Sequence, residues 1–107
     1  MPKLKSYEWG HDQSLHAARG LTRYYQNRIQ ENDLEQWQTG LKIAGEFLKL
    51  LEANTRNPRD YDNLLASAKD FDKDGGSAAF DLLICISFWQ QFLQKHQDLQ
   101  SDEDTSP

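Results

Sequence analysis

The fold is decided by the segment Ala78–Gln97, which reads AAFDLLICISFWQQFLQKHQ. Wound as an α-helix, its first half from Phe80 to Trp89 is apolar on nearly every face, which predicts burial on all sides. A buried strand is the alternative, because periodicity alone does not separate a short buried strand from a buried helix. The alanines before the run and the polar helix formers after it favour a helix, and the chain offers no second strand to pair with it. We therefore predict a central helix that the other helices surround.

The sequence upstream of this segment predicts three more helices. Apolar residues spaced three and four apart indicate a first helix over about 12–30 and a second helix that begins after Asn32. Asn32 and Glu35 have the spacing of a capping box, in which each side chain binds the backbone amide of the other residue. A third helix is expected over about 58–70, where the Asp-rich segment and its glycine pair break it.

Single residues indicate where these helices end or deviate. Asn54 can adopt the left-handed conformation and is expected to end the second helix. Asn57 precedes Pro58, a pair in which asparagine caps a helix and proline occupies its first turn. Gly20 weakens the interior of the first helix and is expected to mark a kink or a close helix contact.

These elements predict an all-α fold, a small antiparallel four-helix bundle with the C-terminal helix central. A chain of 107 residues has room for one modest core and therefore for one domain. Within it we expect an N-terminal arm over 1–11, the helical bundle domain over 12–97 and a disordered acidic tail over 98–107.

Charge is distributed unevenly along the chain. The net charge is −5, but residues 1–30 carry five basic and two acidic side chains, a balance of +3, so residues 31–107 carry −8. Such a protein can present opposite faces to two partners or to a neighbouring copy of itself, although an internally compensated surface gives the same totals.

The segment Asp70–Asp81 has part of the pattern of a calcium-binding EF-hand loop. Aspartates occupy its first, third and fifth positions, a glycine follows, and Asp81 stands at the twelfth. The twelfth residue of such a loop is normally a longer glutamate, the eighth residue here is Ser77 instead of an aliphatic residue, and no second loop exists to pair with it. We favour a turn between two helices, with Ser77 as the cap of the second, and keep a weak calcium-binding module as an alternative.

The sequence gives little support for catalysis. It contains no GxSxG, P-loop or GxGxxG motif, and its histidines do not have the spacing of a zinc site. The single cysteine, Cys85, lies inside the most apolar segment, where a small core residue is the expected role. We expect a non-enzymatic protein with no cofactor, no assigned metal ligands and no small-molecule substrate.

Cationic and aromatic residues of the first two predicted helices are the candidate binding residues. If those helices pack side by side, up to five cations could line one ridge and neutralise phosphates, and Tyr24 could stack on an unpaired base. Trp9, on the predicted arm, is the candidate anchor for a protein partner. The full set is Arg19, Arg23, Tyr24, Arg28, Lys42, Lys49 and Trp9.

Our leading hypothesis is a small helical interaction module, an adaptor or an assembly subunit that binds a protein partner or a second copy of itself. The alternative is a small helical subunit of a ribonucleoprotein that contacts the nucleic-acid backbone, by analogy in size and helicity with the small subunits of CRISPR effector complexes. The sequence has no apolar run of the roughly 20 residues that a membrane span needs and no leader pattern, so we expect a cytoplasmic protein without membrane contact.

Overall fold

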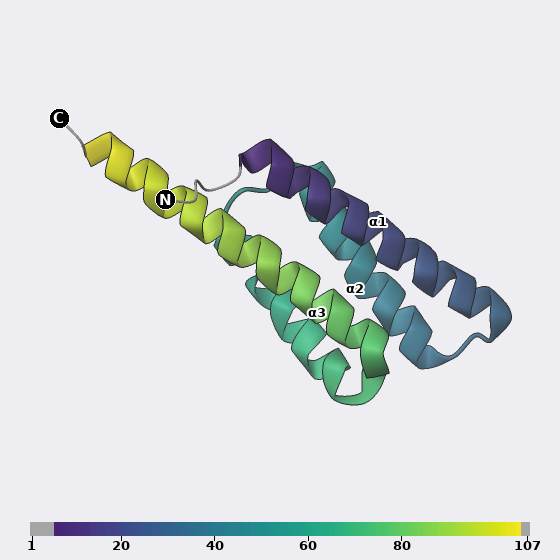
Figure 1. Ribbon diagram of the computed structural model, residues 1–107. Coiled ribbons are helices and arrows are strands. Elements are labelled where there is room, and N and C mark those ends of the chain that lie inside the picture. Colours follow the sequence, from purple (N-terminus) through teal and green to yellow (C-terminus); the bar gives the residue numbers. More distant parts are fainter. Residues whose placement is uncertain (1–5, 106–107) are drawn as a thin grey trace.

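The computed structural model describes the backbone of residues 6–105 and the side chains of residues 6–73 and 79–96. All regular structure in this part of the chain is helical. The elements are α1 (Tyr7–Glu31), α2 (Glu35–Glu52), the short 3₁₀ helix η1 (Pro58–Tyr61) and α3 (Asp62–Thr105). They pack side by side along one direction (Figure 1), which confirms the predicted all-α fold and small helical bundle.

Helix α1 begins at Tyr7, five residues earlier than predicted, so residues 7–11 belong to the helix and not to an arm. The N-cap of α1 is Ser6, which the sequence pattern missed. Its Oγ accepts a hydrogen bond from the Trp9 amide at 3.2 Å. The first turn is also held by tertiary contacts of Tyr7. Its ring centroid lies 5.7 Å from that of Trp89, and the Arg56 guanidinium lies 3.9 Å from the centroid of the Tyr7 ring. Residues 1–5 of the predicted arm lie outside the described residues.

The connection between α1 and α2 differs from the predicted capping box. Asn32 ends α1, because its backbone amide donates to the Arg28 carbonyl at 2.9 Å. Helix α2 starts after Leu34, which has no side chain that could cap it. The end of α2 is as predicted, since Asn54 has the left-handed φ of 55° just beyond the helix.

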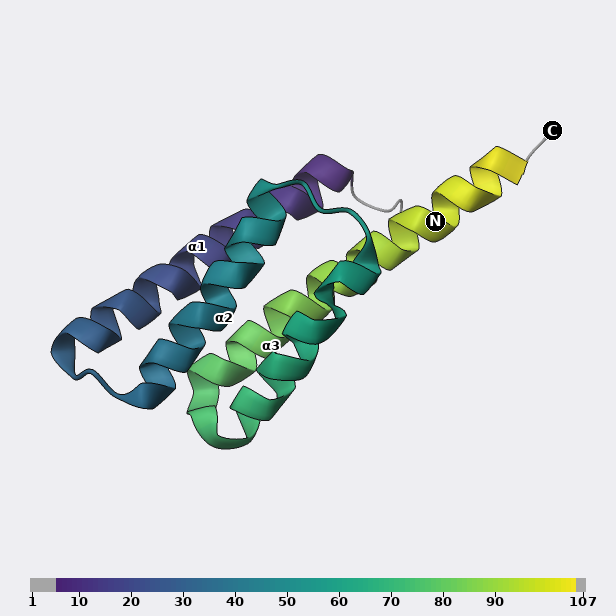
Figure 2. The same ribbon diagram turned by 180° about the vertical axis from the view of Figure 1, so that it is seen from behind.

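The third and fourth predicted helices form one element, α3, that turns back on itself. Asn57 Oδ1 caps η1 by accepting from the Arg59 amide at 3.1 Å, with Pro58 in the first turn as predicted, and α3 follows directly. The first arm of α3, residues 62–73, lies beside its second arm, residues 79–105 (Figures 1 and 2). Gln90 Nε2 in the second arm donates to Asp62 Oδ1 at 2.6 Å and to the Pro58 carbonyl of η1 at 2.8 Å. The side chain of Ser77, the predicted cap, lies outside the described set.

The C-terminal end of α3 projects beyond the other helices, and the molecule measures 59 × 26 × 22 Å. Residues 98–105 of the predicted disordered tail are assigned to this helix. Their side chains are outside the described set, so the tail remains a prediction.

The core lies where α1, α2 and both arms of α3 meet, and aromatic side chains supply its largest members. Those fully buried with the largest volume are Trp89, Tyr25, Tyr61, Phe47, Leu51, Leu82 and Ile86. Burial of each such side chain contributes roughly 1.5–3 kcal/mol relative to leaving it in water. The second arm of α3 therefore supplies three of these seven residues.

The prediction that other helices surround this arm on every side is wrong on one face. Leu82, Ile86 and Trp89 are buried, but the exposed fractions of Phe80, Ile84 and Phe88 are 52%, 47% and 46%. The physical reason is the number of neighbours: α1, α2 and the first arm of α3 cover the inner side of the arm, and no described element lies against the outer side.

Candidate protein-interaction surface

Three apolar side chains form a stripe along the outer side of the second arm of α3. Phe80, Ile84 and Phe88 are spaced four residues apart, which places them above one another on a helix. Each exposes about half of its surface, a large fraction for residues that usually lie inside. Among the flanking positions, Ser87 and Gln91 are polar and uncharged, and Gln91 Nε2 donates to Ser87 Oγ at 3.2 Å, whereas Asp81 is charged and exposed.

A shallow groove of about 180 Å³ runs between this stripe and α1. Its wall on α3 is made by Ile84, Cys85 and Phe88, and its wall on α1 is made by the small or neutral residues Gln13, Ser14 and Ala17. None of the described side chains that line it is charged, although the exposed Asp81 lies near Cys85. A concave strip bordered by phenylalanine and small side chains can accept an apolar ridge, such as one face of a helix.

Trp9 extends the stripe at the N-terminal end of α1. Its exposed fraction is 41%, and its ring centroid lies 6.3 Å from that of Phe92, which in turn lies 5.9 Å from Phe88. Gly10 allows this packing, because a Cβ there would overlap the Phe92 ring. We call Trp9, Phe80, Ile84 and Phe88, together with the groove beside them, the apolar face.

The apolar face has about the area of the largest apolar patch on a typical monomer. With roughly 200 Å² of surface on a large apolar side chain, its four exposed residues present on the order of 350 Å² to solvent. The largest apolar patch on a typical monomer measures roughly 300–600 Å² and often binds a partner.

Cys85 in the groove wall is suited to packing rather than to nucleophilic chemistry. Burial raises the pKa of its thiol above the ordinary value, and nearby Asp81 raises it further. A raised pKa lowers the fraction of reactive thiolate at neutral pH.

The predicted cation and aromatic residues lie on the surface, but they do not all lie together. Tyr24 and Arg28 are brought together at one end of α1, where Arg28 Nε donates to the Tyr24 hydroxyl at 3.2 Å and its guanidinium lies 5.3 Å from the Trp37 ring centroid. Arg28 also pairs with Glu31 at 3.4 Å, which partly neutralises its charge. Arg19, Arg23 and Lys49 are exposed, and no ion pair involving them is found among the described residues.

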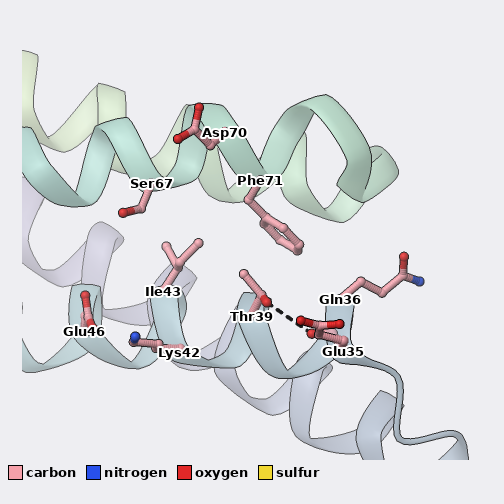
Figure 3. A pocket seen from close by; sticks show the side chains of 9 residues that line it. All are labelled: Glu35, Gln36, Thr39, Lys42, Ile43, Glu46, Ser67, Asp70 and Phe71. Atoms are coloured by element: carbon pink, nitrogen blue, oxygen red, sulfur yellow. Dashed lines mark hydrogen bonds between the residues drawn. The ribbon is translucent and has the colours of Figure 1, made fainter.

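Lys42 lies away from α1, in an open cleft of about 620 Å³ between α2 and the first arm of α3. Figure 3 shows Ile43 and Phe71 pointing toward each other across this cleft, with Glu35 and Glu46 at opposite ends along α2. Lys42 thus lines the same cleft as Glu35, Glu46 and Asp70, and no arginine of α1 lines it among the described residues.

The predicted calcium ligands are only partly described. Asp70 forms an exposed ion pair with Lys73 at 3.6 Å, and the side chain of Asp74 lies outside the described set. Among the side chains of residues 6–73 and 79–96, no three acidic, histidine or cysteine residues are close enough to hold a metal ion.

The structure places the most conspicuous surface feature on residues that the sequence reading assigned to the core. Trp9 was predicted as an anchor and does belong to the apolar face. Phe80, Ile84 and Phe88 were missed, although their regular spacing of four residues was visible in the sequence.

No helix within residues 6–105 combines the length and the apolar content that crossing a bilayer requires. Comparisons with protein-family models, with curated proteins and with solved structures found no match for this chain.

Proposed function

We propose that this chain is a non-enzymatic interaction module, a small subunit that assembles with another protein chain through its apolar face. The observation that carries the proposal is the half-exposed stripe Phe80, Ile84 and Phe88 beside an uncharged groove. Complete burial of such a side chain contributes roughly 1.5–3 kcal/mol. About half of each is already buried, so covering the rest by a partner contributes roughly half of that amount for each residue and provides a driving force for assembly.

The composition of the face supports a protein partner over a nucleic acid. Interface centres between proteins are depleted in charge and enriched in aromatic residues. This face has three aromatic side chains, and none of the described residues that line its groove is charged. Binding to a phosphate backbone depends instead on exposed lysine and arginine side chains that release counterions.

The ribonucleoprotein subunit is the second candidate, and a different observation favours it. Tyr24 is 37% exposed and stands beside the Arg28 guanidinium and Trp37, a combination on which a base could stack. Its weakness is charge: Arg28 is paired with Glu31, and Lys42 lies among carboxylates in the α2–α3 cleft.

Site-specific photo-crosslinking in the native cell tests both candidates. A photoreactive amino acid replaces Phe88 in one variant, Tyr24 in a second and Arg19 in a control variant, all at exposed positions. We expect a defined protein band from position 88 that survives nuclease treatment and is absent from position 19. The same crosslink should form when the crosslinked protein is purified and mixed with this chain.

Two outcomes contradict the proposal. Nuclease-sensitive crosslinks from position 24 without a protein crosslink from position 88 would favour the ribonucleoprotein subunit. Equal labelling from positions 88 and 19 would show that the apolar face has no specific occupant.

A further inference from the structure

We infer that the exposed side of α1 carries a stacking site for one base of a single-stranded nucleic acid, with the base on Tyr24 above Gly20 and its phosphates on Arg19 and Arg23. The inference rests on the second candidate function and gives it a defined site, and it does not involve the apolar face. Three observations carry it: an open space beside an aromatic ring, a ring that is held in place, and two exposed arginines beside the space.

Gly20 leaves an open space on the exposed side of α1. Beyond its chain neighbours and the backbone of its own helix, a Cβ at this position would meet no described atom within 4 Å. Tyr24 follows one turn later, and a long side chain on a helix leans toward the N-terminus, over the turn before it. The Tyr24 ring therefore borders the space above Gly20, which a larger residue at position 20 would fill with its own side chain.

The Tyr24 ring is accessible and yet fixed in position. It is 37% exposed, and its described contacts come from later residues. Arg28 Nε donates to its hydroxyl at 3.2 Å, and the Tyr25 and Trp37 rings meet it at interplanar angles of 80° and 83°. None of these contacts comes from the turn that contains Gly20. A ring held in this way loses little conformational freedom when a base stacks on it.

Arg19 and Arg23 supply positive charge beside the space. They are four residues apart and are therefore neighbours on the surface of α1, and each directly precedes one of the two residues that form the space. Both are exposed, and no ion pair involving either is found among the described residues. Arginine binds phosphate with parallel N–H donors, so these two side chains are suited to the backbone of a bound strand.

Negative charge near the site limits its strength. Glu31 pairs with Arg28 at 3.4 Å. Burial and then the charges of Tyr24 and Asp81 raise the pKa of Tyr25 to about 12, which places Asp81 of α3 near this part of α1. Two arginines beside these carboxylates support weak binding, and we expect a dissociation constant of roughly 10–100 µM at physiological salt, within the range of non-specific binding to nucleic acids.

The shape of the site favours a single strand over a duplex or a free nucleotide. Neither Gly20 nor Tyr24 lines the α2–α3 cleft or the groove of the apolar face, so a free nucleotide would bury little of its surface. A duplex keeps its bases stacked on one another, whereas a single strand presents base faces to aromatic side chains. Because every base has such a face, we expect little sequence preference.

Fluorescence anisotropy of a labelled oligouridine RNA tests the stacking geometry. Gly20→Leu fills the space and should weaken binding at least ~5-fold, although leucine is the better helix former and circular dichroism should show a folded protein. Gly45→Leu is the matched control, because Gly45 in α2 is also a helical glycine without a neighbour within 4 Å of a Cβ, and it should leave the affinity unchanged. Tyr24→Trp should retain binding, whereas Tyr24→Leu should weaken it at least ~5-fold.

Salt dependence separates the arginines from the ring. The slope of log affinity against log salt concentration should fall by about 0.7 for Arg19→Gln and for Arg23→Gln, because each phosphate contact of a single strand contributes about that amount. Tyr24→Leu should weaken binding and leave the slope unchanged. Arg59→Gln, at an exposed arginine of η1, is the control and should change neither quantity.

Several results would overturn the inference. They are a wild type that does not bind oligouridine at low salt, equal effects of Gly20→Leu and Gly45→Leu, and duplex RNA or uridine monophosphate that binds as tightly as the single strand. If one of these is found while nuclease-sensitive crosslinks still form from position 24, the stacking geometry is wrong and the second candidate function stands. If those crosslinks are absent as well, both are wrong. A protein crosslink from position 88 is independent of either result.

Discussion

Gly40 lets α1 and α2 approach each other closely. A Cβ at this position would overlap the ring of Tyr25, one of the largest fully buried side chains, whereas a Cβ at Gly45 in the same helix would meet nothing within 4 Å. The two glycines therefore form a matched pair in which the helix propensity is equal and only the packing differs.

We predict opposite effects of alanine at these two positions. Gly45→Ala should raise the free energy of unfolding by up to about 1 kcal/mol, because alanine is the better helix former. Gly40→Ala should lower it by roughly 1–3 kcal/mol, since overpacking against Tyr25 outweighs the gain in propensity. Urea denaturation of both variants provides the measurement. Equal stabilisation at the two sites would mean that the Tyr25 ring is not held against α2.

At the scale of single residues, the sequence predicted what depends on local conformation. Asn54 in its left-handed conformation and Asn57 capping the helix that opens with Pro58 were correct, because backbone preference alone decides them. Gly20 was expected to mark a kink or a close contact, but a Cβ there would meet open space. The glycine in contact was Gly40, and its role depends on where Tyr25 lies in the folded protein.

At the scale of helices, α3 is held in its folded-back form by a side chain that bridges its two arms. Gln90 Nε2 donates to the carbonyl of buried Pro58 and to Asp62 at the start of the first arm. Gln91, the next residue, forms its hydrogen bond within its own arm, to Ser87. The neighbouring glutamines therefore separate a contact between the arms from a contact within one.

We predict that Gln90→Ala lowers the free energy of unfolding by about 1–2 kcal/mol, because it removes the donor from the part-buried Pro58 carbonyl. Gln91→Ala, at an exposed position, should change it by less than about 0.5 kcal/mol. Thermal and urea unfolding measure both values, and hydrogen exchange should show faster exchange in the first arm of α3 for Gln90→Ala alone. Similar losses for the two variants would count against the bridge.

The helix boundaries that the sequence missed share one cause. Asn32 has the chemistry of an N-cap, but its backbone amide is already used to close α1, so α2 starts without a side-chain cap. Ser6 was not recognised, because the residues after it lack apolar periodicity and α1 is stabilised there by Arg56 and Trp89 from distant segments. Neither the use of the Asn32 amide by α1 nor the contacts of α1 with distant segments can be predicted from the sequence pattern of one segment.

At the scale of the whole molecule, the sequence identified the apolar segment of α3 but not how many elements pack against it. The segment Phe80–Trp89 is apolar on nearly every face, with Asp81 and Ser87 as its polar residues, and the prediction of a central helix assumed that enough neighbours exist to bury it. Three neighbouring elements cover only the inner side, so the surplus became the apolar face. This also explains why the binding residues proposed from charge, such as Arg19 and Lys42, did not indicate the largest surface feature.

Burial also determines how the folded molecule responds to alkaline pH. Tyr25 and Tyr61 are fully buried, and burial raises the pKa of each phenol to about 12 from an ordinary value of 10.0. Because the folded-state pKa lies above the unfolded-state value, the stability linked to these groups is complete below about pH 10 and is lost as the pH rises through about 12. We predict cooperative unfolding in this window, with the two tyrosines ionising as the helical signal is lost.

Phenylalanine variants assign this transition to particular side chains. The Tyr25 hydroxyl has no hydrogen-bond partner among the described residues, so Tyr25→Phe should move the alkaline midpoint upward without loss of stability at neutral pH. Tyr61→Phe should also move the midpoint upward but should cost about 1 kcal/mol at neutral pH, because the Tyr61 hydroxyl donates to the Thr55 carbonyl at 2.8 Å. Tyr24→Phe is the exposed control and should leave the midpoint unchanged. Circular dichroism and phenolate absorbance, followed together against pH, measure the midpoint of each variant. If every tyrosine ionises near pH 10 while the helices persist, then the aromatic core is open to solvent and its burial does not hold the bundle together.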